Sequence, residues 1–385
     1  MRGGTHLYYA CICAIAKDET PHLREWVLHH FSAGFEHIVL YDNGSVEPVS
    51  RTLSDLAAAG LVTVIDFPVR EAPQLSAYFH CLRTWKDRSR WLAFIDIDEF
   101  VLPLARHDVR ELLEDYEAFA GLAAHWMIFG SDGHLRRPAV GVTGSYTRSL
   151  GLHHHVKSLV QPRWTLKPVS PHHFAYAEGR FCVNEDRVPV PAASSYPVAE
   201  KIRINHYFYK SQQDFEEKMR RGLATAVRDA TGRTLEDFYR QSRQSGVPDT
   251  AIAPFLPARK SLSRLPPKEL AAVVTQYCAS GPEEEIAAIA SLAQSGDMAR
   301  ALRRYARLRR YHATPLALTL GANLHFMRDE TEKGLELLGE ALFAASGDAT
   351  LQTWIYEEIG RCYGRLRKTE KAEALKRFLQ SAARH

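Results

Sequence analysis

The sequence predicts an α/β domain with a mostly parallel sheet and helices on both faces, followed by an α-helical region. Three observations lead to this prediction. Over the first 130 residues, short apolar runs alternate with segments of helical periodicity, which is typical of strand–helix–strand units. Three of the apolar runs end in polar residues. Beyond residue 267, helical periodicity dominates.

The expected elements alternate regularly in the first half of the chain. Strands are expected at 7–16, 37–41, 61–67, 91–100 and 121–129, and helices at 20–33, 48–59, 73–85 and 109–119. Thr20-Pro21 supplies a hydroxyl cap and a proline at the first helical position, and Gly34 supplies a stop. Between residues 130 and 209, histidines, aromatics and prolines cluster. We therefore expect irregular loops with short strands there.

Polar residues follow three of the expected strands: Lys17-Asp18-Glu19, Asp42-Asn43 and Asp96-Ile97-Asp98. In a doubly wound sheet these strand ends share one edge, where ligands bind. On an extended chain Asp96 and Asp98 point to the same face, and divalent cations readily bind such carboxylates. The pattern predicts a ligand-binding crevice. The alternative is an acidic strand exit whose carboxylates face water or cap the next helix.

The histidines of the second half leave several interpretations open. His206 lies in the alternating, strand-like run 202–209, where it is either a third metal ligand or a half-buried polar residue. For His153-His154-His155, a solvent-exposed loop is favoured over a metal site.

Length and composition exclude several classes of protein. A chain of 385 residues suggests two domains, and 45% hydrophobic with 24% charged residues is typical of a soluble globular protein. A net charge of +4 is too small to favour nucleic acid as a partner. The six cysteines are scattered, which indicates reduced thiols in the cytoplasm. The run 7–16 leads into charged residues and is expected to be a strand rather than a signal peptide.

We expect three regions: a sheet domain at 1–245, a linker at 246–267 rich in proline and small residues, and a helical repeat-like domain at 268–385. Similar turn-and-helix starts recur at Gly296-Asp297, Arg328-Asp329 and Arg367-Lys368. Their spacing is near the roughly 34 residues of tetratricopeptide (TPR)-like helical pairs, although the last interval is longer.

Several arginines lie on neighbouring helical turns of this last region: Arg300, Arg303, Arg304, Arg307, Arg309 and Arg310. They form either a solvated face or a contact for an acidic protein partner or anionic lipid headgroups. No apolar run approaches the roughly 18–20 residues of a membrane span. Peripheral contact with the inner face of a membrane stays open.

A series of short segments between residues 8 and 222 forms an ordered set: 13–19, 28–30, 40–45, 94–100, Trp126 with 129–134, 156–158, 172–173, 205–211, 215–218 and 221–222. Together they resemble the family 92 glycosyltransferases and their GT2-like bacterial relatives. Two departures stand out. Asp18 replaces the asparagine usual in a Lys-Asn-Glu pattern, and Asp132 replaces a common second serine.

The resemblance implies a GT-A fold, a nucleotide-diphosphate sugar donor such as a UDP-sugar, and Mn²⁺ or Mg²⁺. Asp98 would bind the metal, and Asp96 would share it or contact the ribose. His206 is the candidate third ligand. The remaining residues expected to contact the nucleotide sugar are Lys17, Asp18, Glu19, Asp42 (at the base) and Lys157 (at the diphosphate).

The resemblance also implies inversion by direct displacement, which needs a base for the hydroxyl of a glycan or glycolipid acceptor, as in polysaccharide biosynthesis. Asp132 is the favoured base because its glycine-flanked loop can project into a cleft. A turn residue that hydrogen-bonds its own backbone is the alternative interpretation of Asp132, and Glu178 is the alternative base.

Other classes fit less well. In a haloacid-dehalogenase-type phosphatase, Asp96-Ile97-Asp98 would be followed by threonine or valine rather than Glu99-Phe100. A nucleotidyltransferase is a closer alternative, because it would also use metal-binding carboxylates, but no glycine-rich phosphate loop with basic residues opens the first strand. The non-enzymatic alternative is a helical-repeat scaffold with a degenerate sugar-nucleotide domain.

Overall fold

The computed structural model describes residues 7–221, 234–244, 246–276 and 282–365. The chain divides into two compact units, Tyr8–Thr275 and a second that consists mainly of Gln276–His385. Within the described ranges, no helix combines the length and the apolar character needed to cross a membrane.

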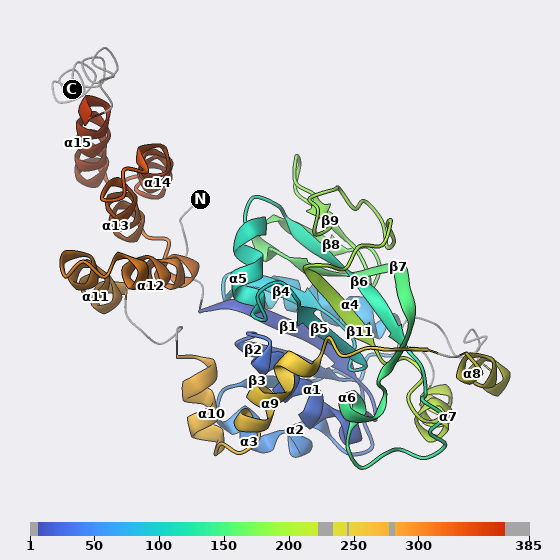
Figure 1. Cartoon of the computed structure of the whole chain (residues 1–385). Helices are drawn as coiled ribbons and strands as arrows, with labels where there is room; N and C mark the ends of the chain where they lie inside the picture. The colour runs from blue at the N-terminus through green and yellow to red at the C-terminus, as the bar shows by residue number, and fades with distance from the viewer. Residues whose placement is uncertain (1–6, 222–233, 245, 277–281, 366–385) are drawn as a thin grey trace. The chain divides into compact units, whose positions relative to one another are not determined.

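The first unit is organised around a ten-stranded mixed sheet with the order β3-β2-β1-β4-β7-β6-β11-β5, in which β10 pairs with β6 and β12 with β7 (Figure 1). The strands are β1 (Tyr8–Ala16), β2 (His37–Asp42), β3 (Val62–Asp66), β4 (Ser89–Phe94), β5 (Glu99–Pro103), β6 (Gly121–Phe129), β7 (Arg148–Val160), β10 (Cys182–Val183), β11 (Ile202–His206) and β12 (Val247–Pro248). Strands β8 (Thr165–Pro168) and β9 (Phe174–Tyr176) form a separate pair. The predicted α/β class is confirmed, but the sheet is mixed and not mostly parallel, because β7 pairs antiparallel with β4 and β6, and β5 with β11.

The strand order reverses beside β1. Strand β1 pairs in parallel with β2 on one side and with β4 on the other. The chain first extends the sheet through β2 and β3 and then returns to add β4. Such a reversal opens a crevice at the carboxyl ends of the two strands it separates. The residues that follow β1 and β4 therefore lie at the position where an α/β sheet binds its ligand.

Helices α1 (Thr20–Ser32) and α4 (Pro73–Trp85) each have a proline in the first turn, as the sequence predicts, but Thr20 is the first residue of α1 and its hydroxyl does not cap the helix. Helix α4 buries Ala77, Tyr78 and Cys81 against alternate residues of β1, among them Cys11 and Cys13. The other helices of this unit are α2 (Val49–Thr52), α3 (Ser54–Ala58), α5 (Val109–Leu113), α6 (Val142–Ser145), α7 (Gln212–Arg221), α8 (Leu235–Ser242), α9 (Leu256–Leu262) and α10 (Pro267–Val274), with short 3₁₀ turns at Glu114–Tyr116, Pro162–Trp164 and Ala253–Phe255.

The strand expected over 91–100 is interrupted. Strand β4 ends at Phe94, and the chain turns before β5 starts at Glu99. The indole N–H of Trp26 in α1 lies 3.1 Å from the carbonyl oxygen of Asp96 and 2.8 Å from that of Glu99, which holds this turn. Asp96 and Asp98 therefore lie in a turn at the sheet edge. The sequence pattern had instead suggested an extended strand.

The region from 130 to 209 is more regular than expected. Strand β7 runs antiparallel between β4 and β6, and β11 pairs in parallel with β6. Strand β5 then pairs antiparallel with β11, with His206 opposite Glu99. These distant strands complete the sheet next to the turn that contains Asp96 and Asp98.

The segment 246–267, expected to be a linker, is folded within the first unit. Strand β12 pairs with β7, and α9 contacts α1. Arg259 of α9 donates to Glu25 of α1 at 2.9 Å, and Arg203 of β11 donates to Asp249 at 2.6 Å. Proline-rich sequence here forms short elements that pack on the sheet domain.

The second unit contains the helices α11 (Pro282–Gln294), α12 (Met298–Tyr311), α13 (Pro315–Phe326), α14 (Thr331–Ala344) and α15 (Ala349–Arg365). Consecutive helices contact one another around a common apolar core. Arg304 pairs with Glu285 at 2.7 Å and Arg309 with Glu340 at 2.9 Å, so part of the arginine-rich face forms ion pairs within the unit. The expected helix start at Arg367-Lys368 lies outside the described residues, and the TPR-like repeat stays a prediction.

Candidate nucleotide-sugar site

Carboxylates and lysines form a cluster at the crevice, and Asp96 is the first of the two aspartates in it. Its Oδ2 accepts from Lys157 Nζ at 3.0 Å, and its Oδ1 accepts from Gln74 Nε2 at 2.6 Å. Strand β7 brings Lys157 here because Leu159 pairs with Ala93 of β4, which places Lys157 just beyond the end of that strand. The Lys157 side chain is fully buried, whereas that of Asp96 keeps 35% of its surface exposed. Asp96 is thus accessible to a ligand and anchored from beneath by a cation.

Asp98, the second aspartate of the cluster, is buried. Its Oδ2 lies 2.6 Å from Lys218 Nζ of α7, and its Oδ1 lies 3.5 Å from His206 Nε2 at the end of β11. Lys218 also lies 3.9 Å from the centroid of the Phe208 ring. The two carboxylates of the motif therefore each have their own lysine, and His206 joins the second one.

Burial and charge together fix the protonation states of this cluster. Burial alone would raise the pKa of Asp98, but the charge of Lys218 holds it well below its usual range. Burial lowers the pKa of His206, and Asp98 offsets this only in part. Burial raises the pKa of Glu99 well above its usual range despite Lys157, which lies 3.6 Å away. Near neutral pH the cluster contains an ionised Asp98 beside a neutral imidazole.

Glu19, which follows β1, belongs to a second charged cluster in the same crevice. It is buried and pairs with Arg221 of α7 and, at 3.6 Å, with Lys210 Nζ. Although burial opposes it, Lys210 and Arg221 lower the pKa of Glu19. The charge of Asp98 also acts on this carboxyl group. The ends of β1 and β4 therefore contribute to one electrostatic environment, and ligand binding there stays a prediction.

Asp18 and Asp42 tie the ends of β1 and β2 together. Asp42 accepts from the backbone N–H groups of Ser45 and Val49, at 2.9 Å each. Asp18 has a positive φ of 52° and accepts from the N–H of Val46 at 2.8 Å. The exposed Lys17 contributes its carbonyl oxygen to Arg221 at 3.2 Å. These residues lie where predicted, but the structure engages both oxygens of Asp42 in its own turn.

Asp214 of α7 links the crevice to the loop after β6. It accepts from His22 Nε2 and Ser211 Oγ at 2.9 and 2.6 Å, and from Arg137 Nε at 2.7 Å. Although burial opposes it, His22 and Ser211 lower the pKa of Asp214. A small pocket opens among these groups and is also lined by Glu19, Lys210 and Arg221. Asp214 thus stabilises one wall of the crevice.

The two candidate bases lie in turns. Asp132, at φ 47°, accepts from the backbone N–H of Thr147 at 2.7 Å and from its hydroxyl at 3.1 Å. Glu178 is exposed in a turn after β9. Glu185 accepts from three successive backbone N–H groups, those of 200–202, and so secures the start of β11. Asp132 thus contacts Thr147, a residue outside its own turn, and the catalytic roles of Asp132 and Glu178 stay predictions.

The residues around Asp98 fit a divalent cation. Two ligands of one octahedral ion, each about 2.1 Å from it, stand about 3 Å apart, close to the 3.5 Å between Asp98 Oδ1 and His206 Nε2. An ionised carboxylate and a neutral imidazole both offer lone pairs. Asp96 could complete the set, although Lys157 and Gln74 already contact its oxygens.

Sequence reasoning placed three basic residues of α7 and the loop before it in the family-like segments but assigned them no role: Lys210, Lys218 and Arg221. Lys218 lies 120 residues from Asp98 in the sequence, so no local spacing could pair them. Besides that resemblance, a local signal was that Lys218 follows Phe215 by three positions, which places both on the same face of the helix. Phe215 is buried, so that face points inward.

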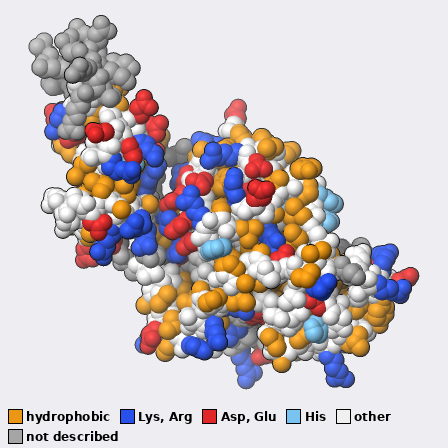
Figure 2. All heavy atoms as spheres, viewed as in Figure 1, with side chains coloured by type: hydrophobic (Ala, Val, Ile, Leu, Met, Phe, Trp, Pro, Cys, Tyr) orange, Lys and Arg blue, Asp and Glu red, His pale blue; other side chains and the backbone are white. Residues whose placement is uncertain are grey.

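Surface charge alone does not mark the site. On the face shown in Figure 2, basic and acidic side chains are interspersed. The site is distinguished by buried charges that meet at the carboxyl ends of parallel strands.

Comparison with known proteins shows which class of protein the chain is similar to. Residues 6–131 match the family model described as Glycosyltransferase family 92. A glycosyltransferase family 92 protein of Ricinus communis is 30% identical over 252 residues, which cover 63% of this chain and 43% of the relative. The galactan beta-1,4-galactosyltransferase GALS2 of Arabidopsis thaliana is 30% identical over 127 residues, covering 29% of this chain and 24% of that protein. These matches show that parts of the chain, including residues 6–131, are similar to glycosyltransferases.

Within that class, the matched segment is similar to glycosyltransferase family 92, which agrees with the resemblance seen in the motifs. The chain spans less than half the length of the two relatives just described. Among solved structures, the alignment with S. aureus TarS 1-349 covers 88% of this chain and 90% of the TarS chain, with 12% identity and a TM-score of 0.29. That likeness is too low to support a conclusion.

Proposed function

We propose that this protein is a glycosyltransferase that moves a sugar from a nucleotide-diphosphate donor, such as a UDP-sugar, to a glycan or glycolipid acceptor. One observation carries the proposal. Asp96 and Asp98, each paired with a lysine, lie at the point where the strand order reverses between β1 and β4. The family match of residues 6–131 covers this turn. We infer a GT-A arrangement of this sheet, and a TPR-like stack for the helices α11 to α15.

The charges of the crevice suit a diphosphate leaving group. Breaking the bond between the sugar and the diphosphate builds negative charge on the departing phosphate, and fixed positive charges stabilise it. Lys218, Lys210 and Arg221 surround the crevice, and each contacts a carboxylate. A bound diphosphate would take over part of these contacts. Lys157 is fully buried beneath Asp96, so in this proposal it orients the carboxylate rather than binding the phosphate.

Asp98 and His206 would hold Mn²⁺ or Mg²⁺, with Asp96 as a further ligand. When bound, the ion supplies Lewis-acid stabilisation of the leaving diphosphate. Lys218 keeps Asp98 ionised and so keeps the ligand in its binding form. Asp96, the more exposed carboxylate, would share the ion or accept a hydrogen bond from the ribose. Asp18 and Asp42 would shape the loop beside the nucleotide, and Asp42 would contact the base.

The reaction we propose is an inverting displacement, in which a base takes the proton of the acceptor hydroxyl. Asp132 is the first candidate and Glu178 the second. Asp132 already accepts two hydrogen bonds from Thr147. Its role as a base therefore requires that the acceptor displace at least one of them.

The test is a screen of nucleotide sugars for hydrolysis and transfer, with Mn²⁺, with Mg²⁺ and with EDTA. We expect one donor to be consumed in a metal-dependent way, and consumption to be lost in Asp98→Asn. Asp55→Asn is the matched control, because Asp55 forms an exposed ion pair with Arg24. If every donor stays intact with wild-type protein and a range of glycan acceptors, the non-catalytic scaffold becomes the better explanation.

A further inference from the structure

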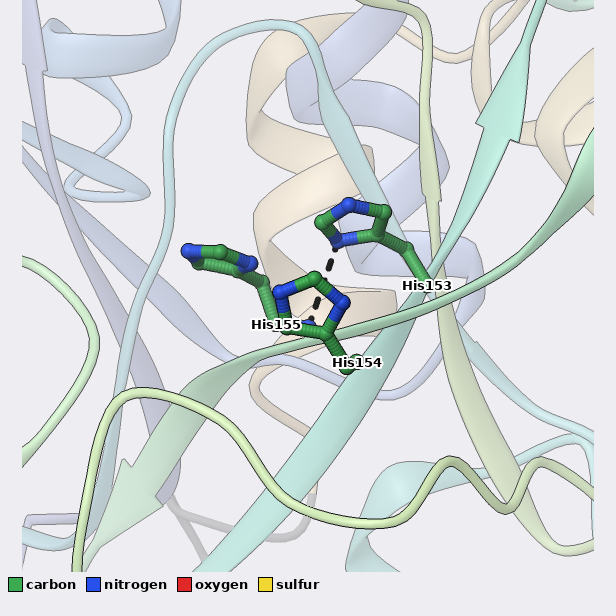
Figure 3. Close-up of side chains that lie close together, drawn as sticks. All are labelled: His153, His154 and His155. Atoms are coloured by element: carbon green, nitrogen blue, oxygen red, sulfur yellow. Dashed lines mark hydrogen bonds between the residues drawn. The ribbon is translucent and has the colours of Figure 1, made fainter.

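Three consecutive histidines of β7 gather at one point, although side chains of a regular strand alternate between two faces. The pairing of β7 with β6 explains this arrangement. His125 pairs with Val156 and the next residue, Trp126, pairs with His153, so His154 and His155 form an insertion. Such a bulge redirects side chains. Figure 3 shows the three rings close together, and one nitrogen from each lies within 4.8 Å of the others.

The backbone of this bulge is held in place. The carbonyl oxygen of His154 accepts from the N–H of Ser195 at 3.0 Å, and the N–H of Val156 donates to Ala193 at 3.2 Å. The ring of His155 stacks on Trp126 with an interplanar angle of 11°. The rings are therefore partly ordered before any ligand binds.

Two nitrogens next to this cluster are buried without a hydrogen-bond partner among the described residues. They are His155 Nδ1, which can offer a lone pair, and Trp126 Nε1, which is an N–H donor and cannot bind a cation. Buried polar atoms are normally satisfied, so each such exception needs an explanation. His153 Nδ1 accepts from the backbone N–H of His155 at 3.2 Å, so its lone pair is engaged and His153 would bind an ion through Nε2. His155 Nδ1 is thus a buried ring nitrogen that is available to an ion.

We propose that His153, His154 and His155 form a binding site for a divalent transition-metal ion of the class that prefers imidazole, with Zn²⁺ as its physiological occupant. Three neutral imidazoles and one open position are a common zinc ligand set. Bonds of about 2.0–2.1 Å place tetrahedral ligands about 3.4 Å apart, so the three nitrogens must draw together. His154 is exposed and can rotate to allow this.

The site differs in chemistry from the one at Asp98, where carboxylate oxygens suit Mn²⁺ or Mg²⁺. The two nevertheless share a neighbour. The ring of Trp126 lies 5.4 Å from that of His155 and 4.3 Å from that of His206. An ion held by the three histidines would lie one aromatic ring away from His206.

The experiment uses the full chain without a histidine tag, freed of metal with a chelator and titrated with Zn²⁺ by calorimetry. Titration with Co²⁺, followed by visible absorption, reports the ligand geometry. We expect one zinc per chain, and a loss of affinity of more than about 100-fold in His154→Ala, since even changes to residues behind a ligand cost about 10–100-fold. His107→Asn is the control, because His107 is exposed and lies outside the cluster.

A second variant guards against misfolding. His153→Ala combined with His154→Ala should abolish zinc binding while the circular dichroism spectrum and the Mn²⁺-dependent binding of UDP are retained. Equal zinc affinity in wild type and His154→Ala would overturn the proposal, as would the absence of zinc binding to wild type. Neither result bears on donor use, because the zinc titration contains no nucleotide.

Discussion

Replacing Asp98 with asparagine gives the sharpest test of the site. The change preserves the shape of the side chain and removes its charge. Asp98 is buried and contacts Lys218 Nζ at 2.6 Å, whose side chain is only 14% exposed. In the wild type this lysine keeps the carboxylate ionised. The variant therefore changes both the ion pair and the proposed metal ligand.

The expected magnitudes follow from this burial. Removing one partner of a buried ion pair costs about 3–5 kcal/mol. We expect about 3 kcal/mol of lost stability, because asparagine still offers an oxygen to Lys218. Loss of a metal ligand should weaken Mn²⁺-dependent UDP binding by at least about 100-fold, or about 2.7 kcal/mol. Urea unfolding followed by circular dichroism measures the first quantity, and calorimetric titration with UDP measures the second.

A double-mutant cycle separates the two effects. Lys218→Met added to Asp98→Asn should recover part of the lost stability, because the buried ammonium group is also removed, but it should not recover UDP binding. Asp55→Asn, in an exposed pair, should cost less than about 1 kcal/mol. Tight UDP binding that survives EDTA, or that is unchanged in Asp98→Asn, would refute the metal role. Failure of Lys218→Met to recover stability would refute the ion-pair reasoning.

Three further predictions follow from buried or crowded groups. Burial lowers the pKa of His29 and His37 to about 4. As the pH falls, these histidines are protonated in the unfolded chain before they are protonated in the folded protein. The free energy of unfolding should therefore be full above about pH 6.5 and fall towards pH 4, by about 3 kcal/mol for each histidine. Urea midpoints that do not fall between pH 7 and pH 5 would contradict this. Gly321→Ala should destabilise the helical unit by about 1–3 kcal/mol, because a Cβ there would lie 1.9 Å from the Tyr305 ring. At Gly339 a Cβ meets nothing within 4 Å, so Gly339→Ala should be neutral or stabilising in the same denaturation assay. If Asp132 only holds the contact with Thr147, Asp132→Asn should keep kcat near wild type, since asparagine tolerates a positive φ and can accept from Thr147. A kcat lowered equally in Asp132→Asn and Asp132→Ala would instead support the role of Asp132 as the base.

Local sequence patterns identified much of the first half of the fold. Helix α4 spans Pro73–Trp85 as predicted, because its proline start and apolar spacing are local signals. The strands β1 to β3 were predicted for the same reason. The helix expected at 48–59 is divided into α2 and α3, which meet at Leu53. The crevice at the ends of β1 and β4 could be predicted because parallel strands end at one edge of a sheet.

Tertiary structure alone decided how the charges of that crevice are balanced. Lys157 reaches Asp96 only because β7 runs antiparallel beside β4, and Lys218 reaches Asp98 from a helix 120 residues away. The same holds for the turn at Asp96, where Trp26 of α1 accounts for the break in the strand. Periodicity describes which face of an element is apolar, but it contains no information about which distant element covers that face. The sequence by itself therefore determined that carboxylates gather at the sheet edge, and only the folded chain determined that each has a buried or nearly buried lysine beside it.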